Sequence, residues 1–232
     1  VCACDVVIVT EDAKFAMTEA AIGIPPAQII PHVASRLGLP VARRMVMTAA
    51  RIGSEEALTI GLADFVAKDG VEAEAKEAEI KKLRNKALLL IGFSGGFRRN
   101  EIVSLDLEDI EFVFEGVKII VKKSKTDQFG EGMTKGIPHF ENSLYCPVTN
   151  LKKWINFSKI RTGPIFVKFS KGPKITRQRL TDQSVALIIK EYLFKAGIDS
   201  KNYSGHSLRS GFATSAAEAG AEERSIMAMT GH

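Results

Sequence analysis

A histidine and an arginine in the stretch GHSLRSGFAT have the types and the spacing to bind a phosphate. His206 and Arg209 are three residues apart, so on a helix they would share one face close to its N-terminus. Backbone N–H groups point outward at that end and favour a negative charge. The motif is short, and it fits equally a helix-capping histidine followed by a solvated arginine.

Other basic residues could take part in the same chemistry. GFRRNEI places Arg98 and Arg99 near the first turn of an expected helix, SKTDQ places Lys125 in a polar loop, and TGH ends the sequence at His232. Two guanidinium groups can fork onto the nonbridging oxygens of a phosphodiester. A lysine on a hairpin can supply a proton to a leaving oxygen, although Lys125 fits equally a solvated loop lysine.

Charge is distributed unevenly along the 232 residues. Residues 1–78 hold 7 Lys and Arg against 11 Asp and Glu, a net charge of −4, whereas residues 79–232 hold 25 against 16, a net charge of +9. A compact positive region favours a polyanion such as nucleic acid. The change of sign also indicates two domains with different partners.

Composition excludes several classes of protein. A chain that is 45% hydrophobic and 25% charged is ordinary for a soluble globular protein. Cys2, Cys4 and Cys146 have no metal-ligand spacing, which predicts thiols rather than a zinc site or a disulfide framework. No apolar run is long enough to span a membrane and no signal peptide is evident, so we expect a cytoplasmic protein that binds neither metal nor membrane.

Hydrophobic periodicity and capping signals predict a mixed first part. We expect strands at 4–10, at 13–19 and at 62–67, and helices at 25–38, 40–50 and 54–61. A charged, alanine-rich stretch at 66–90 has no Pro, Gly or Ser linker. A continuous helix across the boundary at 78 therefore fits the sequence.

The second part is expected to be mainly helical. A strand, a turn and a second strand at 111–123, followed by a third strand at 134–139, predict a small three-stranded antiparallel sheet. Helices are expected at 80–95, 96–110, 146–161, 181–197, 206–220 and 221–231. The predicted fold class is therefore α+β, mainly helical, preceded by an incomplete β/α segment.

Two stretches of residues 1–75, ACDVVIVTEDAKFAMTEAAIGIPP and TAARIGSEEALTIGLADFVA, resemble the crotonase (enoyl-CoA hydratase/isomerase) family. The resemblance implies a fragment of that fold over residues 1–78 and places Glu19 at a catalytic acid/base position. In the family a glycine-rich oxyanion hole, which usually supplies the larger electrostatic stabilisation, lies upstream of the matching segment, and the 232 residues do not contain that stretch. Glu19 therefore fits a solvated or structurally paired acid as well as a working one, and an acyl-CoA hydratase or isomerase fragment is the alternative function.

Residues 79–232 resemble the catalytic domain of tyrosine recombinases, also called phage integrases. Four motifs occur in the family's order: GFRRNEI, SKTDQ, GHSLRSGFAT and TGH. The resemblance implies site-specific DNA recombination and integration by transesterification at a phosphodiester. By motif match it assigns the catalytic positions to Arg98, Lys125, His206, Arg209 and His232.

Each residue receives a role from this resemblance. Arg98 and Arg209 would clamp the transition-state charge, so no metal or other cofactor is expected. Lys125 would be the general acid. His206 would assist proton transfer and hydrogen-bond the phosphate, and His232 would hold the scissile phosphate.

The resemblance also implies partners and a nucleophile. Double-stranded DNA is the expected partner, with a homo-oligomer assembled on it. The family's tyrosine nucleophile follows the last histidine, and the sequence ends at His232. We therefore expect a C-terminally truncated catalytic domain that forms no covalent bond with DNA.

Overall fold

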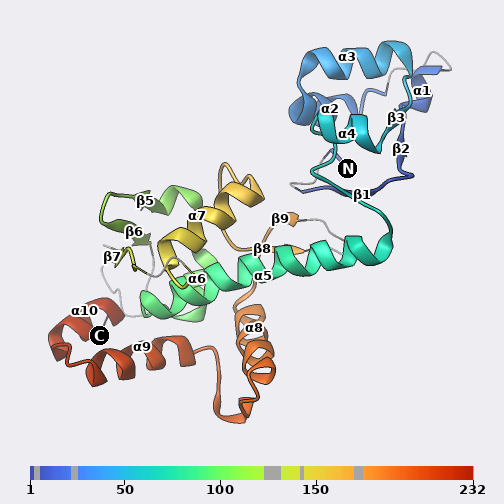
Figure 1. Ribbon diagram of the computed structural model, residues 1–232. Coiled ribbons are helices and arrows are strands. Elements are labelled where there is room, and N and C mark those ends of the chain that lie inside the picture. The colour runs from blue at the N-terminus through green and yellow to red at the C-terminus, as the bar shows by residue number, and fades with distance from the viewer. Residues whose placement is uncertain (3–5, 22–25, 123–131, 142–143, 170–174, 232) are drawn as a thin grey trace. The chain divides into compact units, whose positions relative to one another are not determined.

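A computed structural model describes the chain except residues 3–5, 22–25, 123–131, 142–143, 170–174 and 232. The chain divides into two compact units. The first comprises Val1–Ile80 and Phe169–Thr176, and the second comprises Lys81–Lys168 and Arg177–His232. Figure 1 labels the helices and strands of the chain.

The first unit combines short strands with short helices. Strand β1 pairs in parallel with β4, and β2 pairs antiparallel with β3. The elements are β1 (Ile8–Thr10), β2 (Lys14–Phe15), α1 (Thr18–Ala21), α2 (Ile30–Leu37), α3 (Leu39–Thr48), β3 (Ile52–Gly53), α4 (Ser54–Thr59) and β4 (Phe65–Ala67). The strands predicted at 4–10 and 62–67 and the three predicted helices are present. The strand predicted at 13–19 is limited to β2, because the chain turns into helix α1 from Thr18, and neither α1 nor β3 was predicted.

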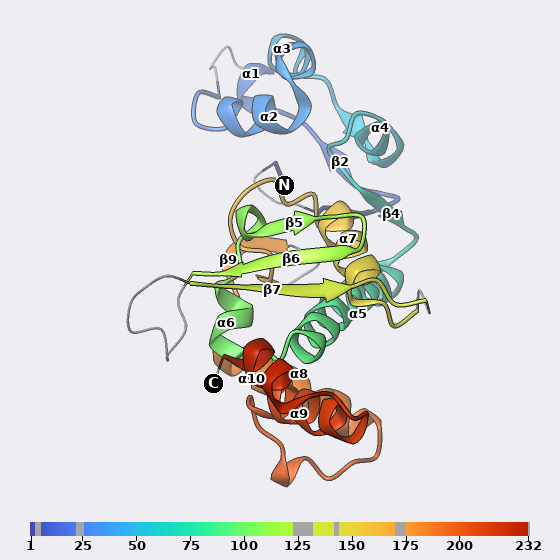
Figure 2. The same cartoon turned by 90° about the vertical axis from the view of Figure 1, so that its left-hand side faces the viewer.

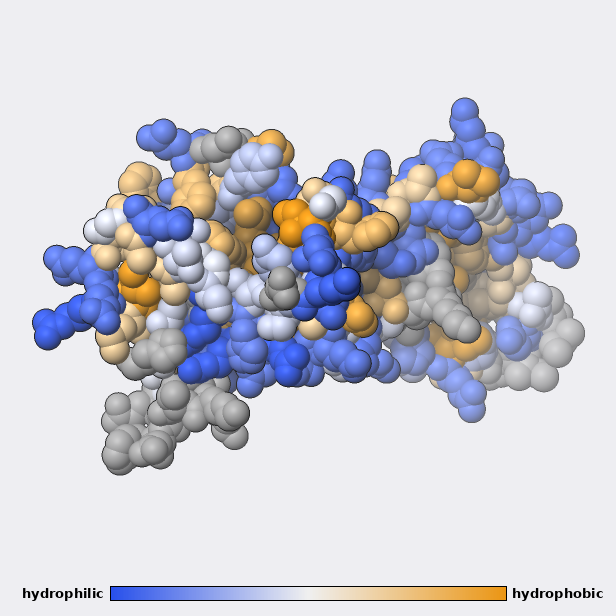
Figure 3. Space-filling model, turned by 90° about the horizontal axis from the view of Figure 1, so that it is seen from below, coloured by the Kyte–Doolittle hydropathy of each residue, from blue (hydrophilic) through white to orange (hydrophobic). Residues whose placement is uncertain are grey.

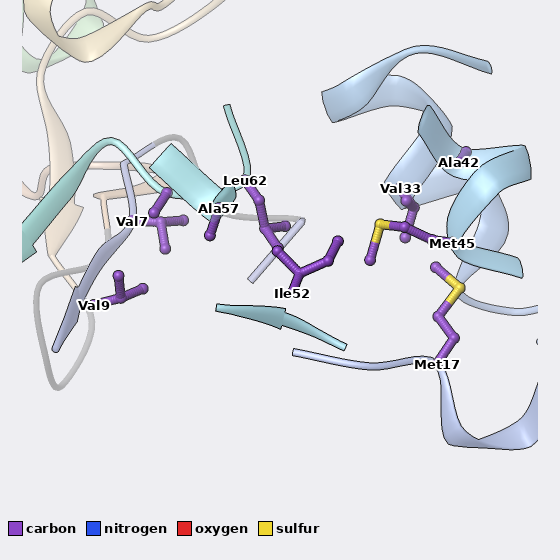
Figure 4. Packing of buried hydrophobic residues seen from close by; sticks show 10 residues of the cluster. Val7, Val9, Met17, Val33, Ala42, Met45, Ile52, Ala57 and Leu62 are labelled. Carbon is purple, nitrogen blue, oxygen red and sulfur yellow. The ribbon is translucent and has the colours of Figure 1, made fainter. Parts of the chain in front are cut away.

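A small hydrophobic core holds the first unit together. Figure 4 shows Val33 and Met45, from α2 and α3, close to Met17. The first unit also contains a largely buried ion pair, in which the Arg36 guanidinium lies 2.7 Å from the Asp64 carboxylate. The same carboxylate accepts the Val7 backbone N–H at 2.8 Å, so burial of that charge is offset by two partners.

Helix α5 (Gly70–Ser94) is continuous through residue 78. The Lys76 ammonium lies 2.7 Å from the Glu72 carboxylate one turn earlier, an arrangement that supports an exposed helix. The C-terminal half carries Leu88 and Ile91, both fully buried. The helix is therefore solvated at its start and part of a core at its end.

The second unit is mainly helical and contains the predicted three-stranded antiparallel sheet. Figure 2 looks onto this sheet, whose strands lie in the order β5, β6, β7. The strands are β5 (Ile110–Phe112), β6 (Gly116–Val121) and β7 (Met133–Pro138), and a separate pair is formed by β8 (Val167–Phe169) and β9 (Ile175–Arg179). The helices after α5 are α6 (Arg99–Ser104), α7 (Pro147–Ser158), α8 (Asp182–Lys195), α9 (Ser207–Glu218) and α10 (Glu223–Thr230).

One predicted helix is shorter than expected. The prediction extended from 96 to 110, but α6 ends at Ser104, and a 3₁₀ turn at Leu107–Asp109 leads into β5. The Leu105 backbone is extended and its carbonyl accepts the Ile165 N–H at 3.1 Å. A backbone partner distant in sequence therefore ends the helix, overriding local propensity.

The core of the second unit centres on α7 and the strand that follows it. Trp154 is fully buried and its indole N–H donates to the Ile165 carbonyl at 2.9 Å, which satisfies the polar atom of a large apolar side chain. On the surface of α8, Leu187 and Phe194 are exposed. In Figure 3, which views the side where α8 and α9 lie in Figure 1, separate hydrophobic residues interrupt a largely hydrophilic surface.

Candidate phosphate-binding site

Arg98 is held at the start of α6 by a carboxylate on the same helix. It occupies the N-cap position, and its backbone N–H donates to the Glu101 carboxylate at 2.9 Å. Its guanidinium also lies 2.9 Å from that carboxylate. Glu101 is almost completely buried, so the arginine balances a charge that water cannot reach.

Arg209 extends from the first turn of α9 toward the turn between α5 and α6. The residue is buried, and its guanidinium donates to the Gly96 carbonyl at 3.2 Å. Burial, together with the charge of Arg98, lowers the pKa of Arg209. Arg98 and Arg209 also line the same pocket, and two positive charges in one pocket favour an anion there.

His206 is the N-cap residue of α9, and its side chain is exposed. The imidazole makes no capping hydrogen bond, which argues against the alternative of a helix-capping histidine. Serines hold the turn that leads into the helix, since the Ser204 N–H donates to the Ser207 hydroxyl at 2.8 Å. The imidazole therefore lies at the helix start without a structural role in the cap.

An open pocket of about 780 Å³ brings these three side chains together. One part of its wall is basic, and the other is formed by small and apolar residues of α9, α10 and the turn between them. The lining residues are Arg98, His206, Arg209, Ser210, Ala213, Ala217, Ala221, Glu223, Ile226, Met227 and Thr230. Two guanidinium groups and an imidazole in one open pocket can bind a phosphodiester through charge-assisted hydrogen bonds.

The other predicted site residues either lie outside the described residues or do not line this pocket. Lys125 and His232 lie outside the residues that the structure describes. Arg99 is the adjacent arginine of GFRRNEI, which could match the motif position in place of Arg98. It lies 3.2 Å from the Asp182 carboxylate and does not line the pocket. Glu19, the alternative acid, is partly exposed on α1 in the first unit, and its role stays a prediction.

Sequence reasoning missed a fully buried lysine beside the arginines. Lys135 on β7 has no exposed surface, and its ammonium lies 3.9 Å from the Glu101 carboxylate. Burial lowers the pKa of Lys135 to about 8. The signal was available in TKGIP, because Lys135 and Ile137 alternate with residues that face solvent, and side chains two apart on a strand share a face.

Among the described residues, no group of three or more His, Cys, Asp or Glu side chains could hold a metal ion. Within those residues, too, every helix falls short of the length and apolar character needed to cross a membrane.

The second unit is thus a mainly helical domain with an open pocket whose lining includes two arginines and a histidine. Sequence comparison identifies the family: the profile described as the phage integrase family matches residues 65–232, and the chain belongs to that family. A second profile, enoyl-CoA hydratase/isomerase, matches residues 1–93. The chain is therefore a recombinase-family domain preceded by a segment similar to crotonases.

Individual relatives agree with this assignment. The integrase/recombinase xerD homolog of Selenomonas ruminantium is 43% identical over 156 residues, which cover 67% of this chain and 46% of that protein. Tyrosine recombinase XerD of Proteus mirabilis is 30% identical over 65% of this chain and 44% of its own length. The chain thus spans about half the length of the curated relatives it matches.

A solved structure shares the fold. The XerH site-specific recombinase bound to difH substrate superposes with a TM-score of 0.50 and 18% identity, over 71% of this chain and 46% of that one. At this identity the similarity concerns the fold alone. The predicted fold class, mainly helical with a small antiparallel sheet, is confirmed.

Proposed function

We propose that the second unit binds double-stranded DNA and that Arg98 and Arg209 grip a backbone phosphate, as the binding part of site-specific recombination. The observation that carries the proposal is the meeting of Arg98, His206 and Arg209 in one open pocket. The net charge of +9 on residues 79–232 adds a favourable long-range field. XerH, a protein of the same fold, was solved bound to difH substrate.

The chemistry proposed for the pocket is phosphodiester transesterification. Arg98 and Arg209 would stabilise the extra charge on the nonbridging oxygens, and His206 would assist proton transfer. Lys125 would protonate the leaving oxygen, and His232 would hold the scissile phosphate. These side chains supply the charge stabilisation and the proton transfers themselves, so the proposal includes no metal or other cofactor.

The covalent step needs a tyrosine hydroxyl as the nucleophile, so a tyrosine would have to reach the phosphate in the pocket. The sequence holds three, Tyr145, Tyr192 and Tyr203, and none of them lines the pocket. We therefore propose that a polypeptide of residues 1–232 binds DNA without forming a covalent bond to it. A protein–DNA species that survives denaturant would contradict this part of the proposal.

Substitution of Arg209 tests phosphate binding directly. We expect Arg209→Ala to weaken binding of a fluorescently labelled duplex about tenfold or more at low salt, because a charge-assisted hydrogen-bonding pair is lost. Arg209→Lys keeps the charge but loses the planar fork, and should bind with intermediate affinity. The measurement is the dissociation constant by fluorescence anisotropy.

The matched control is Arg161→Ala. Arg161 is exposed and does not line the pocket, so its removal subtracts the same charge without touching the site. We expect it to change affinity less than threefold. Equal affinities of the Arg209→Ala and Arg161→Ala proteins would refute the proposed role of the pocket.

A further inference from the structure

Lys135 is a buried charge for which the proposed reaction has no role. It lies on the middle of β7 with its side chain directed inward, between Thr134 and Gly136, which face solvent. A buried ammonium is costly unless every donor finds an acceptor or a negative charge. The contacts of Lys135 therefore indicate why a lysine is retained at this position.

The ammonium is anchored to the turn between α5 and α6. It donates to the Gly95 carbonyl at 2.8 Å and lies 3.4 Å from the Gly96 carbonyl. It also lies 4.4 Å from the centre of the Phe97 ring, within the range of a cation–π contact. Three consecutive residues that lead into Arg98 are thus held by one side chain.

The groups that hold Lys135 also hold the two arginines. The Gly96 carbonyl accepts from Arg209 at 3.2 Å, and the Glu101 carboxylate, 3.9 Å from Lys135, pairs with Arg98 at 2.9 Å. Lys135 therefore shares one acceptor with each arginine: the Gly96 carbonyl with Arg209 and the Glu101 carboxylate with Arg98.

We propose that Lys135 is a positioning residue for phosphate binding: its ammonium fixes the Gly96 carbonyl and shares the charge of Glu101, and so holds Arg209 and Arg98 ready to grip a phosphate. This inference rests on the proposed function of the pocket. Without the shared charge, Arg98 alone would balance a buried carboxylate and would bind a phosphate less readily.

Protonation of Lys135 gives the proposal a measurable signature. The charged groups that face it are Glu101 and Arg98 on α6 and Arg209 on α9. Its pKa of about 8 means that the ammonium is charged near pH 7 and largely neutral near pH 9. Affinity for DNA should therefore fall as pH rises through about 8, well below the usual titration of lysine.

The experiment compares Lys135→Met with the unchanged 232-residue protein. Methionine keeps a long, flexible side chain but removes the charge. We expect the variant to bind a labelled duplex about tenfold more weakly near pH 7. We also expect the unchanged protein to lose about threefold or more in affinity between about pH 7 and pH 9, and the variant to lose this dependence.

Two further variants separate positioning from packing. Lys135→Arg keeps the charge and should recover part of the affinity, whereas Lys118→Met is the matched control. Lys118 lies on the neighbouring strand β6 with an exposed side chain, 3.8 Å from Glu111, and its removal should leave the pH dependence unchanged. A purely structural role for Lys135 would move the melting temperature but not the pH profile of binding.

Each outcome has a defined meaning. If Lys135→Met is folded and keeps both the affinity and the pH dependence, the inference is wrong. If that variant does not fold, the unchanged protein still decides, because a constant affinity between about pH 7 and pH 9 would overturn the inference. If Arg209→Ala binds DNA normally, the proposed function fails first, whereas weak binding by Arg209→Ala with normal binding by Lys135→Met rejects the inference alone.

Discussion

Cys146 shows how the surroundings of one side chain set its charge. The thiol is fully buried at the N-cap of α7, and burial by itself would raise its pKa. Hydrogen bonds to the sulfur outweigh burial: Thr149 and Phe140 donate backbone N–H groups at 3.5 and 3.4 Å, and His139 Nδ1 lies 3.8 Å away. The pKa of Cys146 is lowered to about 6.

This shift predicts a pH-dependent stability. A free thiol titrates near pH 8.5 in an unfolded chain, so the folded state gains stability from the thiolate above that pH. The gain disappears as pH falls through about 6. We expect Cys146→Ala to remove a contribution on the order of 2 kcal/mol at about pH 8.5 and almost nothing at about pH 5.

Denaturant unfolding at a series of pH values measures this contribution. The difference in the free energy of unfolding between the two proteins should shrink steadily as pH is lowered. A difference that stays constant across that range would show that the thiol remains neutral in the folded state.

At the residue scale, the sequence predicted residues that belong to recognisable motifs better than residues whose contacts depend on the tertiary fold. Arg98, His206 and Arg209 belong to motifs with recognisable order, and the structure brings them together. Lys135 and the role of Glu101 were not predicted, because their contacts join elements distant in sequence. The alternation in TKGIP places Lys135 on the same face as Ile137, but only the contacts of β7 with the rest of the unit show what the lysine binds.

The turn between α5 and α6 is the element on which the site depends. Gly95 approaches the Phe97 ring so closely that a Cβ atom at Gly95 would lie 2.2 Å from a ring carbon. Phe97 is fully buried and cannot move into solvent. A side chain at Gly95 must therefore displace either the ring or the turn.

Gly95→Ala is expected to destabilise the second unit by about 1–3 kcal/mol, the usual cost of overpacking a core. It should also weaken DNA binding, because the Gly95 and Gly96 carbonyls anchor Lys135 and Arg209. Thermal melting measures the loss of stability, and the dissociation constant for a duplex measures the loss of DNA binding.

Gly136→Ala is the control, since a Cβ atom at Gly136 meets nothing within 4 Å. Similar losses of stability and affinity in both variants would contradict the argument.

At the element scale, local signals predicted helices well where capping was strong. The helix predicted from Thr181 is confirmed as α8, and the Thr181 side chain accepts the Ser184 N–H. The prediction failed beyond Ser104, and it missed β8 and β9. The segment after Ser104 is fixed by backbone partners far away in the chain, such as Leu107 with Gly163, whereas β8 and β9 pair with each other; the local periodicity revealed neither arrangement.

At the scale of the whole molecule, the positive charge lies in the part of the chain that matches the phage integrase family. Residues 79–232 carry the positive charge, and the phage integrase profile covers residues 65–232. The boundary predicted at residue 78 stays a prediction, because α5 is continuous there and the two family profiles overlap at residues 65–93. The crotonase-like segment carries the opposite net charge and is not expected to add to DNA affinity.

The most direct test of the central claim is the salt dependence of DNA binding by the 232-residue protein. Each phosphate neutralised by the protein contributes about −0.9 to the slope of log affinity against log salt concentration. We predict a slope on the order of −4 or steeper, reduced by about one in Arg98→Ala and in Arg209→Ala. A flat slope, or a steep slope that neither substitution changes, would contradict phosphate binding by this pocket.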